Sequence, residues 1–290
     1  MRKLWTLFTG TLLIASLTGC NQMGQNAQDA DAAYAQIRDR FQEQQAFSFY
    51  GRTKLLTGDT ANGNVVNFSG QKQGDDLLMN VKLSFPERKR VDSMSILAKG
   101  QKLYARSGDR QGWRIVDGRD GSLRQELNNW NPSFNFQQMN EMKASVVTEV
   151  DRNPEDNLQA VRVLFDSTKL KNWLSQQMKE QTGTQIQTVH SPRLKLAMTL
   201  SDGDWKNRRP GMTVQATEPN IDQIIDQMEL EAECSIYYDQ TTMLPTSTVM
   251  SIRSQYDLNN QRVQEHSQVE TFLQDYGQVR PLPDPMSNRP

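Results

Sequence analysis

The chain has 290 residues and a formal net charge of −1 at pH 7, with positive and negative residues mixed. Such a balance offers no clustered basic face, so we exclude nucleic acid as a partner. Hydrophobic residues make up 36% of the chain, which is less than usual, but their clear periodicity argues against disorder.

The first 20 residues have the organisation of an export signal. Arg2 and Lys3 form a short basic segment, and residues 4–15 form an apolar core. This core suits a leader better than a membrane-spanning helix, which needs about 20 apolar residues. The run Leu17-Thr18-Gly19-Cys20 resembles the processing site of bacterial lipoproteins. The resemblance implies cleavage before Cys20 and lipid attachment to it; an uncleaved anchor or ordinary secretion is the alternative.

Processing at this site would leave about 270 residues, enough for one large domain or two small ones. The loss of two basic residues would change the net charge from −1 to −3. The resemblance implies a protein held on the extracytoplasmic face of the cell membrane by acyl chains on Cys20, which bind firmly when there are two or three of them. Cys234 then has no disulfide partner, and its alternating neighbours favour a buried, inert thiol over a reactive or partner-linked one.

The mature chain is predicted to begin with a flexible tether over residues 20–29, followed by an amphipathic helix over 30–41. Alternation of apolar and polar residues then predicts strands, separated by turn signals, at 47–54, 66–68, 79–85, 93–98, 102–106, 113–116, 145–151, 158–165, 194–200, 231–238, 247–256 and 262–273. Further helices are predicted at 134–143, at 170–178 with Asp166 or Ser167 as the cap, and at 221–228.

This order of elements predicts an α+β fold. One large, curved antiparallel sheet, an unclosed β-barrel, would have two or three helices covering its concave face. We expect residues 30–279 to form this single domain and the proline-rich residues 280–290 to form an extended or disordered tail.

Several features together resemble a known family. These are the lipoprotein signal, the first helix with its hairpin meander, and the segments Gly112-Trp113, Tyr237-Tyr238-Asp239 and Leu244-Pro245-Thr246. They look like the Gram-positive lipoproteins that share a half-barrel with the LolA and LolB lipoprotein carriers, and the mycobacterial lipid-binding lipoproteins have a similar architecture. The resemblance implies an apolar concave face, roofed by helices, that takes acyl chains or an amphipathic partner. It implies no catalytic residues.

Enzymatic chemistry finds little support in the sequence. His190 and His266 are far apart, in a predicted turn and on the wet side of a predicted strand, and neither has neighbours at metal-ligand spacing. The glycine-containing run 117–121 lacks calcium-loop spacing and indicates a hairpin turn. We therefore expect no enzyme, no cofactor and no metal.

The methionine-containing strands suggest a surface that accepts variable apolar shapes, although methionine also fills ordinary cores. By alternation alone, the residues expected to line a ligand-binding cavity are Phe47, Phe49, Met79, Val81, Leu83, Leu196, Met198, Met250 and Ile252. Trp130, Trp173 and Trp205 are candidates for its rim. The leading hypothesis is a lipid- or amphiphile-binding lipoprotein. The alternative is a non-enzymatic interaction or assembly module of the cell envelope or spore.

Overall fold

A computed structural model of the protein describes residues 21–57, 65–85, 90–108, 112–116, 127, 130–149, 157–182, 221–258 and 261–285. Several sequence predictions lie outside this part of the chain. They are the export signal with Cys20, the hairpin turn at 117–121, the strand at 194–200 with Leu196 and Met198, and the residues His190 and Trp205.

Eleven antiparallel strands form one sheet, in the spatial order β6-β5-β4-β3-β2-β1-β11-β10-β9-β8-β7. The strands are β1 Ala46–Thr57, β2 Val65–Gln73, β3 Asp76–Phe85, β4 Arg90–Lys99, β5 Lys102–Ser107, β6 Arg114–Val116, β7 Lys143–Glu149, β8 Leu158–Phe165, β9 Glu229–Asp239, β10 Pro245–Leu258 and β11 Gln261–Gln274. Two meanders, β1 to β6 and β7 to β11, meet where the first strand pairs with the last. Among the described strands β6 and β7 do not pair, so the sheet is unclosed.

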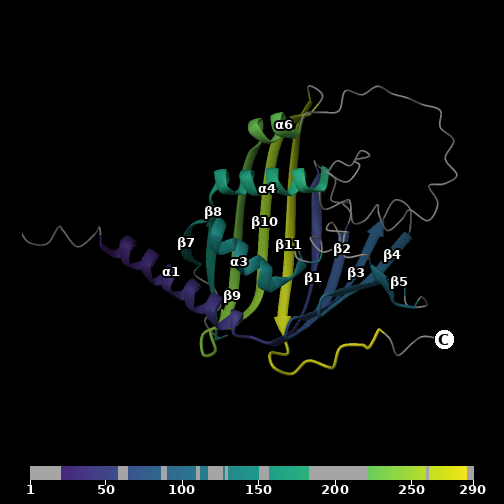
Figure 1. Ribbon diagram of the computed structural model, residues 1–290. Helices are drawn as coiled ribbons and strands as arrows, with labels where there is room; N and C mark the ends of the chain where they lie inside the picture. The colour runs from purple at the N-terminus through teal and green to yellow at the C-terminus, as the bar shows by residue number, and fades with distance from the viewer. Residues whose placement is uncertain are drawn as a thin grey trace, which may run out of the picture.

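Helices lie on one face of this sheet, which we call the inner face. They are α1 Asn21–Gln42, α3 Pro132–Met142, α4 Ser167–Thr182 and α6 Ile221–Gln227. Figure 1 shows α3 and α4 lying one above the other across the central strands, with α6 near the upper ends of β9 and β10. The expected fold class, a large unclosed antiparallel sheet with a few helices, is confirmed.

Helix α1 packs through the apolar stripe that its sequence predicts. Ala30, Tyr34, Ile37 and Phe41 recur every three or four residues and are each at most 1% exposed. The helix begins at Asn21, however, so the segment expected as a flexible tether is helical from that residue onward. Its first turns project beyond the edge of the sheet (Figure 1).

Short polar contacts fix where the next two helices begin. The Asn131 side chain caps α3 by accepting a hydrogen bond from the Ser133 backbone N–H at 3.1 Å. Asp166 caps α4 in the same way, with Oδ1 accepting from the Lys169 N–H at 2.9 Å. Ser167, the other predicted cap, instead donates from Oγ to the Leu230 carbonyl at 2.9 Å, which ties α4 to β9.

Strands β1 and β2 approach each other through reciprocal phenylalanine–glycine pairs. Phe49 lies opposite Gly70, and Gly51 lies opposite Phe68. Each ring lies over the glycine of the neighbouring strand, because a Cβ built on Gly51 would be 2.4 Å from the Phe68 ring and one on Gly70 would be 2.3 Å from the Phe49 ring. Glycine therefore leaves the room that the two rings occupy on the inner face.

Candidate ligand-binding face

The inner face carries two apolar clusters, which are covered mainly by different helices. The first cluster combines the α1 stripe and the buried side chains of α3 with inner-face residues from both meanders. Three aromatic rings join its helices to the sheet, since the Phe41 ring centroid is 4.9 Å from Phe47 and 4.7 Å from Phe136. The second cluster is smaller and lies where α4 and α6 meet β9 and β10. Its buried members are Leu170, Met228, Leu230 and Tyr256.

Five of the predicted lining residues are enclosed in the protein interior: four belong to the first cluster, and Leu83 is the fifth. Phe47, Phe49, Met79, Val81 and Leu83 are all on the inner face, as alternation predicted, and each is at most 2% exposed. In this structure they pack as core. The sequence could not distinguish a covered face from an open one, because both have the same alternation.

Met250 and Ile252, the other predicted lining residues that the structure describes, are only partly buried. Met250 packs against the first cluster and Ile252, two residues on, against the second. Met250 lies opposite Val269, which lies opposite Thr53 on β1. We call this row, Thr53, Val269, Met250 and Ile252, the seam between the two clusters. Thr53 and Val269 were not among the residues predicted to line a cavity.

Three side chains on the inner face or on the segments that cover it bury polar atoms without a hydrogen-bond partner among the described residues. They are the Thr53 hydroxyl and the indole nitrogens of Trp130 and Trp173. Trp130 is only 6% exposed and belongs to the first cluster, so it is a buried residue in this structure. Trp173, on α4, packs against the second cluster and remains partly exposed.

Cys234 lies on the inner face of β9, opposite Met250, and is 1% exposed. Burial raises the pKa of this thiol to about 12, so it is protonated and unreactive at neutral pH. Burial also raises the pKa of Tyr34, whose hydroxyl donates to the Phe136 carbonyl at 3.5 Å. The predicted buried thiol is confirmed.

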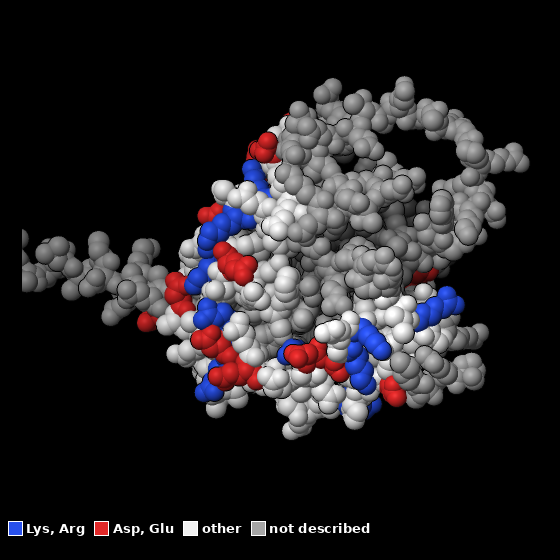
Figure 2. All heavy atoms as spheres, in the orientation of Figure 1, with Lys and Arg blue, Asp and Glu red and all other residues white. Residues whose placement is uncertain are grey.

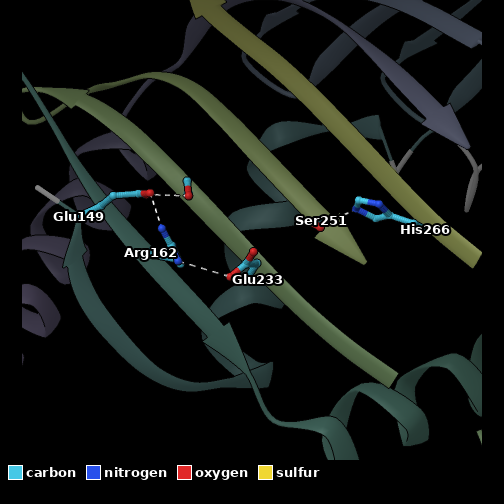
Figure 3. Close-up of polar contacts among 6 residues, drawn as sticks. Glu149, Arg162, Glu233, Ser251 and His266 are labelled. Atoms are coloured by element: carbon cyan, nitrogen blue, oxygen red, sulfur yellow. Dashed lines mark hydrogen bonds and ion pairs between the residues drawn. The ribbon is translucent and has the colours of Figure 1, made fainter. Parts of the chain in front are cut away.

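The opposite, outer face carries cross-strand polar contacts (Figure 3). Arg162 pairs with Glu149 on β7 and with Glu233 on β9 at 3.7 Å, and Ser235 donates to Glu149 at 2.7 Å. Burial alone would raise the pKa of Glu149, but the hydrogen bonds from Arg162 and Ser235 hold it below its usual value. These contacts join three neighbouring strands.

His266 also lies on the outer face, where its Nε2 is 3.0 Å from the Ser251 hydroxyl (Figure 3). This is a pair on the surface of the sheet, as the predicted wet side of the strand implied. No group of three or more His, Cys, Asp and Glu residues within the described chain could hold a metal ion. None of the described helices is long and apolar enough to cross a membrane. Basic and acidic side chains are interspersed on the described part of the face shown in Figure 2.

The fold and the clustered face define an unclosed antiparallel half-barrel with helices packed on its inner side. No protein-family model matches the chain, and no curated protein matches it significantly. Among solved structures, it is similar to LprF from Mycobacterium bovis, with 10% identity, 90% of this chain and 98% of that chain covered, and a TM-score of 0.42.

It is also similar to the lipoprotein LppX of Mycobacterium tuberculosis, with 7% identity over 87% of this chain and 99% of that chain and a TM-score of 0.38. A LolA superfamily protein from Nitrosomonas europaea aligns at 9% identity over 90% and 97% of the two chains, with a TM-score of 0.27. These scores are low, so the description of the fold rests on the strand order of this chain.

Proposed function

We propose that this protein is a non-enzymatic, extracytoplasmic lipoprotein that binds a lipid or another amphipathic ligand on the inner face of its half-barrel. Lipid on Cys20 would anchor it to the cell membrane. The ligand's acyl chains would lie along the seam and extend over the neighbouring apolar residues. The helical segment before Ala30 would connect the anchor to the domain.

The observation that carries this proposal is the seam. Its apolar members Val269, Met250 and Ile252 are only partly buried, although they adjoin two clusters that are well packed. Met250 can adapt its shape to a neighbouring chain, because its side chain is flexible and polarizable. The seam also lies where the cover passes from α1 and α3 to α4 and α6, and Met142 at the end of α3 reaches the second cluster.

Burial of apolar surface would supply the binding energy. Each methylene removed from water contributes about 0.8 kcal/mol, and release requires only that the same surface be exposed again. Helix α3 is held to α1 through a 2.9 Å hydrogen bond from Arg38 to Asn140, whereas α4 is held to β9 through Ser167. A further hydrogen bond, from Lys169 on α4 to the Glu141 carbonyl on α3 at 3.2 Å, joins the two helices, so they would shift together as a ligand enters.

The direct test is to purify the full chain from a bacterial membrane in mild detergent and extract the bound lipid. We expect a lipid of defined mass to co-purify in a fixed molar ratio, and Met250→Asp to abolish it. Val249→Asp is the matched control, because it places the same charge on the same strand but on the outer face. Equal amounts of lipid with both variants, each with a normal melting temperature, would overturn the proposal.

The anchor can be tested separately by the intact mass of the purified chain. We expect a mass that corresponds to cleavage before Cys20 plus added acyl groups, and Cys20→Ala to prevent both changes. An unmodified cysteine in the purified chain would refute the anchor without affecting the ligand-binding proposal.

A second candidate function is protein docking through the outer face. Tyr50 and Phe272 stack there with ring centroids 5.0 Å apart, and they are 46% and 40% exposed. Exposed aromatic pairs are frequent in protein interfaces. If the chain carries no lipid but captures an envelope protein, and if Tyr50→Ser abolishes that capture, docking becomes the better account.

A further inference from the structure

The inner face contains buried hydrogen-bond donors whose partners are missing from the described structure. Thr53 is 5% exposed and Trp130 is 6% exposed. Neither the Thr53 hydroxyl nor the Trp130 indole nitrogen finds a hydrogen-bond partner within the described chain. Such a group costs about 1–3 kcal/mol when it is left unpaired, so natural proteins rarely keep one without a reason.

These two donors belong to one small region of the inner face. The Trp130 ring centroid is 4.8 Å from that of Phe68. The Phe68 ring lies over Gly51, which is two residues before Thr53 on the same face of β1. Trp130 thus contacts the Phe68 ring, and Thr53 lies diagonally across from Phe68 in the pairing of β1 with β2, opposite Val269 of the seam on its other side.

The missing partner must be an acceptor, because an indole N–H can only donate. It should also be uncharged. Thr53 and Trp130 are themselves neutral and almost fully buried, and a carboxylate or phosphate bound between them would lose its hydration. An ester carbonyl meets both requirements, and it is attached to the acyl chains that the surrounding apolar surface would bury.

We propose that Thr53 and Trp130 form a recognition site for the ester carbonyls of an acyl lipid, so that the protein prefers ester-linked over ether-linked chains. This inference rests on the proposed lipid-binding function and makes it more specific. The Thr53 hydroxyl and the Trp130 N–H donate to the ligand's carbonyl oxygens. An ether oxygen in the same place is a weaker acceptor and leaves at least one of the donors without a partner.

The test compares two probes with equal chain lengths. The full chain, in mild detergent, is titrated with dipalmitoylglycerol and with its ether analogue dihexadecylglycerol. The detergent competes with both probes alike, so the ratio of the two affinities is the readout. One neutral hydrogen bond predicts about 3- to 10-fold tighter binding of the ester. We expect Thr53→Val and Trp130→Phe each to lower this ratio toward 1.

The melting temperature of the ligand-free variants distinguishes carbonyl recognition by Thr53 from a role in packing alone. Thr53→Val keeps the side-chain shape and removes an unpaired hydroxyl, so the melting temperature without ligand should stay the same or rise. Thr271→Val is the matched control, because Thr271 is equally buried on the inner face and its hydroxyl is not among the unpaired atoms. It should leave the ester preference unchanged.

The outcomes are distinct. If neither probe binds, the proposed function and this inference both fail. If both probes bind equally, or if Thr53→Val lowers the melting temperature and keeps the ester preference, lipid binding stands and the carbonyl site is refuted. Equal binding of the two probes would indicate that water or another part of the chain satisfies the two donors.

Discussion

Gly51 provides a sharp test of how closely the strands approach at the centre of the sheet. A Cβ at this position would lie 2.2 Å from the Glu270 carbonyl oxygen on β11 and 2.4 Å from the Phe68 ring on β2. The ring could turn aside, but the carbonyl oxygen belongs to the backbone that pairs β1 with β11. Ordinary contact begins at 3.4 Å, so Gly51→Ala must move the two strands apart by about 1.2 Å at this point.

Overpacking of this kind costs about 1–3 kcal/mol, and a backbone clash belongs at the upper end of that range. Alanine also restricts the unfolded chain, which stabilises the folded protein by about 0.4–1 kcal/mol. The free energy of unfolding should therefore fall by about 2 kcal/mol in total. For a domain of this size, that loss corresponds to a melting temperature lower by about 4–8 °C. Urea unfolding followed by circular dichroism would measure it as a lower midpoint at an unchanged slope.

Gly112→Ala is the control, because a Cβ there meets nothing within 4 Å. It should leave the stability unchanged or raise it by a few tenths of a kcal/mol. Wild-type stability in Gly51→Ala would refute the close approach of β1, β2 and β11. A loss of similar size in Gly112→Ala would show that the effect is not specific to the crowded position.

Three further predictions concern the core and the outer face. In a Cys20→Ala chain, Cys234 should resist a thiol reagent at pH 8 and react at once in urea; equal rates would contradict its burial. Ile37→Ala should lower the free energy of unfolding by about 2–5 kcal/mol, whereas exposed Gln42→Ala should change it by less than about 0.5 kcal/mol. Because the pKa of Glu149 is lowered by folding, its contribution to stability is present above about pH 4.3 and is lost on acidification. Glu149→Gln should therefore weaken the dependence of stability on acid pH, and an unchanged acid titration would contradict the assigned hydrogen bonds.

Local periodicity was sufficient to predict most of the described elements. The stripe of α1 and strand β8 at Leu158–Phe165 agree closely with the pattern of apolar residues. The face of each predicted lining residue that the structure describes was also correct, because side chains alternate strictly along a strand. Periodicity could not predict how deeply each side chain is buried. Phe47 and Met79 are enclosed because helices pack over the sheet, and that packing depends on the whole fold.

Two other features were beyond the sequence pattern for physical reasons. Residues 21–29 carry no apolar stripe, yet they are helical, because extending an existing helix is far easier than starting one. The unpaired donors Thr53 and Trp130 could not be recognised either. Whether a polar side chain has a partner depends on neighbours from distant segments.

Because β1 pairs with β11, the centre of the sheet cannot form until nearly the whole chain has been synthesised. Ser48 and its hydrogen-bond partner Asp275 are 227 residues apart, and at the usual 5–20 residues per second translation separates them by roughly 10 to 45 s. Throughout that time the β1 edge has no partner from its own chain on the β11 side. An exposed strand edge invites pairing with other chains. Productive folding of this protein therefore favours conditions in which the nascent chain is held unfolded, or kept apart from its copies, until β11 has been made.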